Sequence, residues 1–155
     1  MTLALNMIVK NEAGNISECV MSAKLLVDEI VILDTGSTDD TVSIARNLGA
    51  KVFNFEWCDD FSVARNEALS KVSAKWVLVL DADERIAMED HERILSIIDD
   101  DSVDGYLMLQ RHYLKGAGYD KWRVVTGQYS KKEEGYTGYR ENFILRLFRN
   151  YDFVK

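Results

Sequence analysis

The clearest sign of how this 155-residue chain folds is the stretch WVLVLDAD at Trp76–Asp83. Five consecutive apolar residues are typical of a β-strand that is covered on both faces. The run ends in two acids, at the end of the strand where open parallel sheets bind their ligands. The stretch therefore predicts a buried strand of an α/β domain.

Comparable apolar runs predict further strands at Leu3–Val9, Glu29–Leu33 and Lys51–Phe55. Apolar residues at helical spacing predict helices from about Glu12, from Ser37 or Thr38, at Phe61–Val72 and at about Glu89–Ile98. This alternation implies right-handed crossovers and a mostly parallel central sheet flanked by helices.

Two helices allow finer predictions. Ser37 or Thr38 offers an N-cap oxygen, followed by two acids in the first turn, and Gly49 is expected to stop the same helix. In the last helix, Ile94, Leu95 and Ile98 are expected to face the core.

The last third of the chain follows another pattern. Gly105–Tyr113 and Asn142–Arg149 are extended and aromatic-rich, and we expect them to add antiparallel strands. Lys115–Tyr139 between them holds five glycines and reads as a long loop. It is interpreted either as a mobile flap over the binding cleft or as a plain hairpin loop whose aromatic side chains pack on the core.

Composition narrows the class of protein. The formal net charge of −7 argues against a nucleic-acid-binding face, and no apolar run is long enough to span a membrane. Cys19 and Cys58 form no CxxC pair and are expected to be reduced thiols. A cytoplasmic protein, at most peripheral to a membrane, is expected.

Polar clusters follow three of the predicted strands: Lys10-Asn11-Glu12, Asp34–Asp39 and Asp81–Glu84. In a parallel sheet these ends meet at one edge. Each cluster alone is also compatible with a simple helix cap. Three clusters at one edge favour a ligand site.

Asp81 and Asp83 form the sharpest part of this pattern, because carboxylates two residues apart in an extended chain project to one side. Such a pair suits Mn²⁺ or Mg²⁺, whose coordination would be completed by water and substrate phosphates. His91 and His112 are isolated, so no zinc site is expected. Arg65 is compatible with a surface salt bridge or with a clamp on phosphate.

Taken in order, the motifs MIVKNE at Met7–Glu12, VILDTGSTD at Val31–Asp39, ARN at Ala64–Asn66 and LDADE at Leu80–Glu84 resemble family 2 glycosyltransferases of GT-A fold. The likeness covers residues 1 to about 90 closely and 142–150 loosely. It implies a single GT-A-like, Rossmann-like domain over residues 1–155. Residues 1–100 would be the nucleotide-sugar-binding half, and residues 101–155 part of the acceptor-binding half.

The resemblance also implies transfer of a sugar, with inversion, from a nucleotide donor that is usually a UDP-sugar. Asp34 would face the base, and Arg65 the diphosphate. Asp81 would contact ribose or sugar and help to hold the metal, which Asp83 would ligate. The remaining residues expected to line the donor pocket are Val9, Lys10, Asn11, Glu12 and Ser37.

Relatives of this branch continue past the segment RLFRN, here Arg146–Asn150, into a glycine and a His-Glu pair that this chain lacks. A truncated catalytic domain is therefore expected, with no catalytic base assigned. The acceptor (glycan, lipid or protein) and the oligomeric state stay open.

Three other functions compete with this one. A dehalogenase-type phosphatase also ends a strand in DxD, and a nucleotidyltransferase also binds nucleotide and Mg²⁺ at a parallel edge. In the phosphatases the motif normally opens the chain, however, and the glycine- and arginine-rich opening loop of the nucleotidyltransferases is missing from Leu3–Gly14. A nucleotide-binding module without transferase activity is the third alternative.

Overall fold

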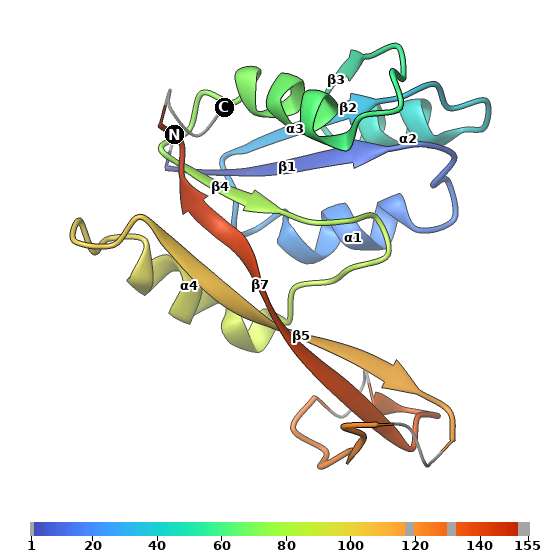
Figure 1. Cartoon of the computed structure of the whole chain (residues 1–155), viewed down its shortest axis with the longest axis vertical. Helices are drawn as coiled ribbons and strands as arrows, with labels where there is room; N and C mark the ends of the chain where they lie inside the picture. Colours follow the sequence, from blue (N-terminus) through green and yellow to red (C-terminus); the bar gives the residue numbers. More distant parts are fainter. Residues whose placement is uncertain (1, 117–119, 130–132, 152–155) are drawn as a thin grey trace. The chain divides into compact units, whose positions relative to one another are not determined.

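The computed structural model describes residues 2–116, 120–129 and 133–151. Its strands are β1 Leu3–Val9, β2 Glu29–Asp34, β3 Lys51–Asn54, β4 Trp76–Val79, β5 Gly105–Leu114, β6 Arg123–Val124 and β7 Gly138–Arg149. Its helices are α1 Ile16–Ala23, α2 Thr41–Asn47, α3 Phe61–Ser70, the 3₁₀ helix η1 Met88–Asp90 and α4 His91–Ile97. The βα alternation predicted up to residue 100 is confirmed (Figure 1).

The chain divides into two compact units, which we describe separately. One comprises residues up to 105 together with those from 146 onward, and the other comprises residues 106–145.

In the first unit the strands lie in the order β3-β2-β1-β4-β7. The first four run parallel, with Leu5 opposite both Ile30 of β2 and Leu78 of β4. β7 runs antiparallel to β4, with Leu147 opposite Leu78. The predicted α/β class, with a mostly parallel sheet and antiparallel strands added late in the chain, is confirmed. The three strands whose polar ends are predicted to meet at one edge, β2, β1 and β4, are neighbours.

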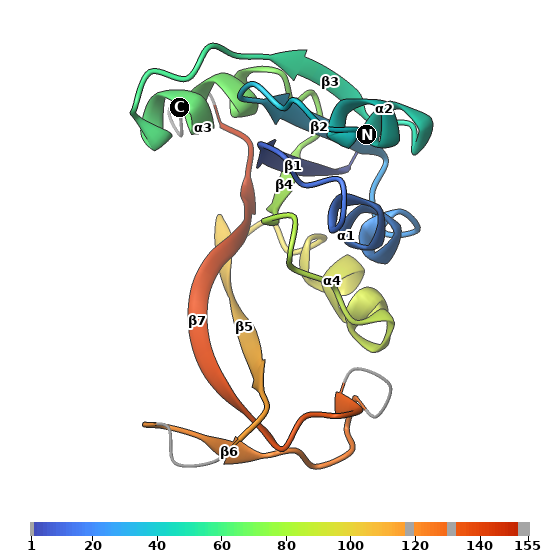
Figure 2. The ribbon, with the colours of Figure 1, turned by 90° about the vertical axis from the view of Figure 1, so that its right-hand side faces the viewer.

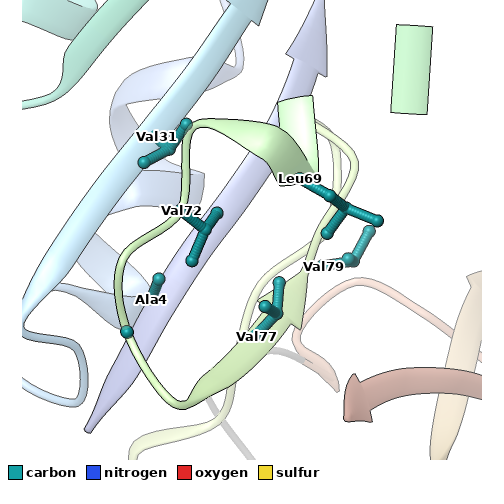
Figure 3. Close-up of a cluster of buried hydrophobic side chains, with 7 residues drawn as sticks. Ala4, Val31, Leu69, Val72, Val77 and Val79 are labelled. Atoms are coloured by element: carbon teal, nitrogen blue, oxygen red, sulfur yellow. The ribbon is translucent and has the colours of Figure 1, made fainter. Parts of the chain in front are cut away.

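Helices cover the parallel strands on both faces, with α1 and α2 together on one face and α3 on the other (Figure 2). Strand β1 explains how the two layers form, because its residues alternate between the faces. Side chains of three strands, of α3 and of the α3–β4 connection pack into one cluster (Figure 3). Its fully or nearly fully buried members are Ala4, Val31, Leu69, Val72, Ala74, Val77 and Val79.

Two details of the helices differ from prediction. The first helix begins at Ile16 rather than near Glu12, because the intervening residues belong to the loop after β1. In α4, Ile94 and the following Ile98 are buried, but Leu95 is 45% exposed. The prediction for Leu95 was wrong because α4 has only two turns and buries a narrow stripe.

Glu29, the first residue of β2, is buried beneath the α3–β4 connection. Its carboxylate accepts hydrogen bonds from Lys51 Nζ at 2.7 Å and from the N–H groups of Ser73 and Ala74 at 2.9 and 3.2 Å. Burial by itself raises the pKa of Glu29, but the hydrogen bonds from Lys51 and Ser73 outweigh it. The pKa therefore lies below the ordinary value of 4.5.

The variant Glu29→Gln is expected to lose about 1–3 kcal/mol of unfolding free energy at neutral pH, since an amide cannot accept all of these donors. A carboxyl with a lowered pKa stabilises the fold above its unfolded-state pKa and ceases to do so as the pH falls through its folded-state pKa. Acid should therefore destabilise the wild type more than Glu29→Gln below pH 4.5. Urea unfolding against pH measures this. Glu92→Gln, on the exposed face of α4, is the control, and equal acid slopes would contradict the prediction.

In the second unit, β7 pairs with β5 and, in antiparallel register, with β6. Arg111 lies over the rings of Tyr129 and Tyr139, at 5.0 and 4.5 Å from their centroids, and forms an ion pair with Glu141 at 3.3 Å. Part of the segment predicted as one long loop is therefore β6 and the start of β7.

Three tyrosines of that segment, Tyr129, Tyr136 and Tyr139, contact side chains of the second unit. Tyr136 contacts Tyr113, with 5.6 Å between ring centroids. Residues 117–119 and 130–132, which the flap hypothesis includes, lie outside the described residues. Whether the segment moves as a flap remains a prediction.

None of the helices in the described part of the chain combines the length and the apolar character that crossing a membrane requires. Both cysteines are free thiols, as predicted, with Cys19 buried and Cys58 exposed.

Candidate functional site

The candidate site lies at the edge of the first unit where β1, β2 and β4 end. Because these strands are parallel neighbours, the three polar clusters that follow them meet at this edge, as predicted. The start of α3, which carries Arg65, and the end of β7, which carries Arg146, complete it.

Asn11 ties the loops after β1 and β2 together. Its N–H donates to Oγ of Ser37 at 2.9 Å, and its Oδ1 accepts from the N–H of Thr38 at 2.8 Å. Asn11 has a φ of 56°, in the left-handed region where asparagine is enriched. Two residues predicted to bind the donor, Asn11 and Ser37, thus contact each other and shape this part of the edge.

A second set of hydrogen bonds joins the same loops. The N–H of Glu12 donates to Oγ1 of Thr41 at 2.7 Å, and the N–H of Ala13 donates to Oδ2 of Asp39 at 3.1 Å. The side-chain hydrogen bond from Thr41 is the main reason why the pKa of Asp39 is lowered. Charged Asp39 therefore holds the loop before α1 against the start of α2.

These contacts correct the predicted cap of α2. Asp40 occupies the N-cap position and its side chain makes no capping hydrogen bond. Ser37 and Thr38 do not cap the helix, because they are engaged with Asn11 on the neighbouring loop.

Asp34 is buried at the end of β2, and its carboxylate accepts from the N–H groups of Gly36 and Ser37 at 3.2 and 3.1 Å. Gly36 has a φ of 103°, which a side chain would strain. Asp34 therefore holds a tight turn.

The side chain of Val9 is buried, whereas that of Lys10 is exposed. The side chain of Val9 is 2% exposed and faces the core, and only its carbonyl takes part in the loop, accepting from the N–H of Thr35 at 3.0 Å. Lys10 is exposed at the edge.

Asp81 and Asp83 lie in a turn rather than on an extended strand. β4 ends at Val79, and the N–H of Glu84 donates to the carbonyl of Asp81 at 2.9 Å. Both aspartates are nevertheless exposed, with Ala82 buried between them. The extended conformation from which both carboxylates were predicted to project to one side is therefore absent, because the chain turns directly after β4.

Neighbouring elements hold this turn in place. Cys19 of α1 donates from Sγ to the carbonyl of Asp81 at 3.4 Å, and burial raises the pKa of its thiol to about 12. Arg85 donates to the carbonyls of Ala82 and Glu84, both at 2.8 Å. The backbone that carries the two acids is thus fixed from both sides.

Arg146 of β7 reaches the same turn. Its Nη2 donates to Oδ2 of Asp81 at 2.7 Å and to Oε1 of Glu84 at 2.6 Å. The other oxygen of Glu84 accepts from the N–H of Asp81 at 2.8 Å. Burial by itself lowers the pKa of Arg146, but these two carboxylates outweigh it and the pKa is raised.

Arg65 lies beside this group without joining it. Its Nη1 donates to Oδ1 of Asn6 at 3.3 Å, and no carboxylate of the described residues forms an ion pair with it. Burial lowers the pKa of Arg65, which the charges of Asp81 and Arg146 also influence. Within the described part of the chain, the alternative of a surface salt bridge for Arg65 is not observed.

Asn6 and Arg146 were missed as site residues. Asn6 is fully buried in β1, where its Nδ2 also donates to the carbonyl of Ala68 in α3 at 3.0 Å. The sequence could have indicated Asn6, because it is the one polar residue in an otherwise apolar strand. Arg146 gave no local signal, because it lies 65 residues from Asp81.

The described residues contain no group of three or more His, Cys, Asp or Glu side chains suited to a metal ion. A divalent cation at this edge would therefore need ligands from water and substrate, as Mg²⁺ usually does. Asp83 fits this requirement, because its carboxylate is exposed. One oxygen of Asp81 is already held by Arg146.

Comparison with known proteins identifies relatives of the chain. A sequence model described as glycosyl transferase family 2 matches residues 5–151. An uncharacterized glycosyltransferase of Rickettsia felis is 40% identical over 103 residues, which cover 66% of this chain and 36% of that protein. A TPR repeat-containing protein of Synechococcus elongatus is 40% identical over 114 residues, covering 74% of this chain and 28% of that protein. The chain spans about a third of the length of these relatives.

Solved structures share the fold. S. aureus TarS 1–349 superposes with a TM-score of 0.62 at 24% identity, covering 97% of this chain and 47% of TarS. The same protein in complex with UDP gives a TM-score of 0.59 at 26% identity, and the match covers 82% of this chain and 39% of TarS. Glucosyl-3-phosphoglycerate synthase from Mycobacterium tuberculosis, in complex with Mn²⁺ and UDP-glucose, gives a TM-score of 0.56 at 23% identity. The match covers 67% of this chain and 42% of the synthase.

Proposed function

The chain belongs to glycosyl transferase family 2, and from this premise we propose that it binds a UDP-sugar together with Mn²⁺ or Mg²⁺ and transfers the sugar, with inversion, to an acceptor hydroxyl. The observation that carries the proposal is the meeting of Asp81, Asp83 and Arg65 at one edge of the sheet. This edge is where open parallel sheets bind nucleotides. TarS, which is 26% identical to this chain in its UDP complex, supports UDP as the nucleotide.

Arg65 is the proposed ligand of the donor diphosphate. A guanidinium matches phosphate oxygens in geometry as well as in charge. Arg65 is available for this because Asn6, rather than an acid, is its hydrogen-bond partner in the described residues. Asn6 orients the guanidinium and leaves its charge uncompensated by direct contact.

Asp83 would hold the cation, and Asp81 would accept a hydrogen bond from ribose or sugar. When bound, the cation supplies positive charge that stabilises the leaving nucleoside diphosphate. The turn that carries both acids is fixed by Cys19 and Arg85, so that little reorganisation is needed when the donor arrives.

The loops after β1 and β2 would form the base-binding side. Asp34 and Ser37 face this side through one tight turn, and the backbone of Lys10, Asn11 and Glu12 lines the neighbouring loop. Val9 would contribute its backbone only, since its side chain faces the core.

Residues 1–100 would thus form the donor-binding half, and residues 101–155 part of the acceptor side. The acceptor hydroxyl, on a glycan, lipid or protein, must lose its proton to a carboxylate base, to which no residue is assigned. We also place the chain in the cytoplasm, because both cysteines are free thiols and disulfides are rare there.

Calorimetry with UDP tests the proposal directly. Addition of Mn²⁺ is expected to raise the affinity for UDP at least about tenfold over that in EDTA, because the cation would add positive charge for the diphosphate and Asp83 would hold it. ADP titrated under the same conditions is the control for base recognition. The same UDP affinity in EDTA as in Mn²⁺, or no binding of UDP, would refute the proposed function.

A further inference from the structure

Arg146 holds only one of the two aspartates of the turn. Its Nη2 lies 2.7 Å from Oδ2 of Asp81 and 2.6 Å from Oε1 of Glu84. The exposed carboxylate of Asp83 is outside this network. Arg146 therefore makes the two acids chemically different, although the sequence presents them as an equivalent pair.

We propose that Arg146 is a positioning residue that keeps Asp81 out of the coordination of the divalent cation, and so leaves Asp83 as the protein ligand of the metal. This inference rests on the proposed function, since it concerns the same cation. It also divides the two roles that the sequence pattern assigned jointly to Asp81.

The first argument is competition for the same oxygen. A cation bound to Oδ2 of Asp81 would have to displace a charge-assisted hydrogen bond, or come within a few ångströms of the guanidinium. Both outcomes are unfavourable, because the positive charges repel each other in a partly buried site.

The second argument is that Arg146 cannot easily move away. Its side chain is 11% exposed and that of Glu84 is 12% exposed, so the pair is largely shielded from water. Removing the guanidinium would break this largely buried ion pair, which is destabilising. Glu84 thus anchors Arg146, and Arg146 in turn anchors Asp81.

The consequence is a specific geometry for the donor. Asp81 is 54% exposed despite its ion pair, so its carboxylate still faces the ligand. Held by Arg146, Asp81 can accept a hydrogen bond from a hydroxyl of the donor. Asp83 would then be left to hold the cation.

A double-mutant cycle tests this division. Mn²⁺ affinity is measured by electron paramagnetic resonance at saturating UDP, for the wild type, Asp81→Asn, Arg146→Met and the double variant. Asp81→Asn should change the Mn²⁺ affinity by less than about threefold in the wild type and lower it at least about tenfold in Arg146→Met, where the released Asp81 becomes a ligand.

Arg149→Met is the matched control. Arg149 also lies on β7 and is similarly buried, at 13% exposed, but it pairs with Asp101 and packs on Trp76 at the opposite end of β4. The Asp81→Asn effect should be the same in Arg149→Met as in the wild type. Thermal unfolding checks that each variant is folded.

Two results would overturn the inference. One is an equal effect of Asp81→Asn in the wild type and in Arg146→Met. The other is a loss of Mn²⁺ binding in Asp81→Asn alone as large as that in Asp83→Asn, and this comparison stands even if Arg146→Met does not fold. Failure of the wild type to bind Mn²⁺ with UDP would instead refute the proposed function itself.

Discussion

Replacing Asp83 with asparagine is expected to weaken UDP binding in the presence of Mn²⁺ at least about tenfold, toward the affinity in EDTA, since even residues that merely support metal ligands cost 10–100-fold when replaced. The substitution removes the negative charge and keeps the size of the side chain. Asp83 is exposed in its turn, so its replacement should leave the fold intact. A loss of affinity would therefore report the loss of cation binding.

Two controls make the Asp83 experiment decisive. Asp99→Asn changes the same chemical group at an exposed position after α4 and should bind UDP and Mn²⁺ as the wild type does. In EDTA, Asp83→Asn and the wild type should have equal affinity for UDP, because the cation is absent from both. Calorimetry that finds unchanged affinity of Asp83→Asn in Mn²⁺ would remove Asp83 from the metal site.

The largest expected effect on stability comes from the centre of the sheet. Leu78→Ala should lower the free energy of unfolding by about 3–5 kcal/mol, because it leaves a cavity that rigid neighbours cannot fill. Leu78 is fully buried between β1 and β7, where it lies opposite Leu5 and Leu147. Urea unfolding at constant pH measures the change.

Leu95→Ala is the matched control, since it deletes the same atoms from a side chain that is 45% exposed. Its expected effect is about 0.5 kcal/mol or less. Similar losses of unfolding free energy for the two variants would contradict the difference in burial between Leu78 and Leu95. The pair also tests the correction to α4, where periodicity alone placed Leu95 in the core.

Much of the fold could be predicted because it depends on local patterns. Apolar runs such as Leu3–Val9 and Trp76–Val79 can be buried only as central strands, and the helices between them require parallel pairing. Parallel strands of one sheet end at a common edge, as β2, β1 and β4 do. The same rule brings the acids after these strands to one edge.

Local patterns were less informative where polar side chains had several partners available. Ser37 and Thr38 have the chemistry of helix caps, yet both contact Asn11 on the neighbouring loop. An N-cap and a loop-to-loop contact use the same oxygen atoms. Sequence spacing cannot distinguish them, because the competing partner comes from 26 or 27 residues away.

The sequence of residues 76–83 and of the segments after β1 and β2 was thus sufficient to predict the fold class, the edge of the candidate site and the acids at that edge. The distinction between Asp81 and Asp83 came from elsewhere, because it depends on Arg146, a residue of β7 that antiparallel pairing with β4 brings beside the turn. The orientation of Arg65 likewise depends on Asn6, across the packing of α3 on β1. Strand and helix propensity act over a few residues, whereas ion pairs depend on distances in space that exist only once the sheet has formed.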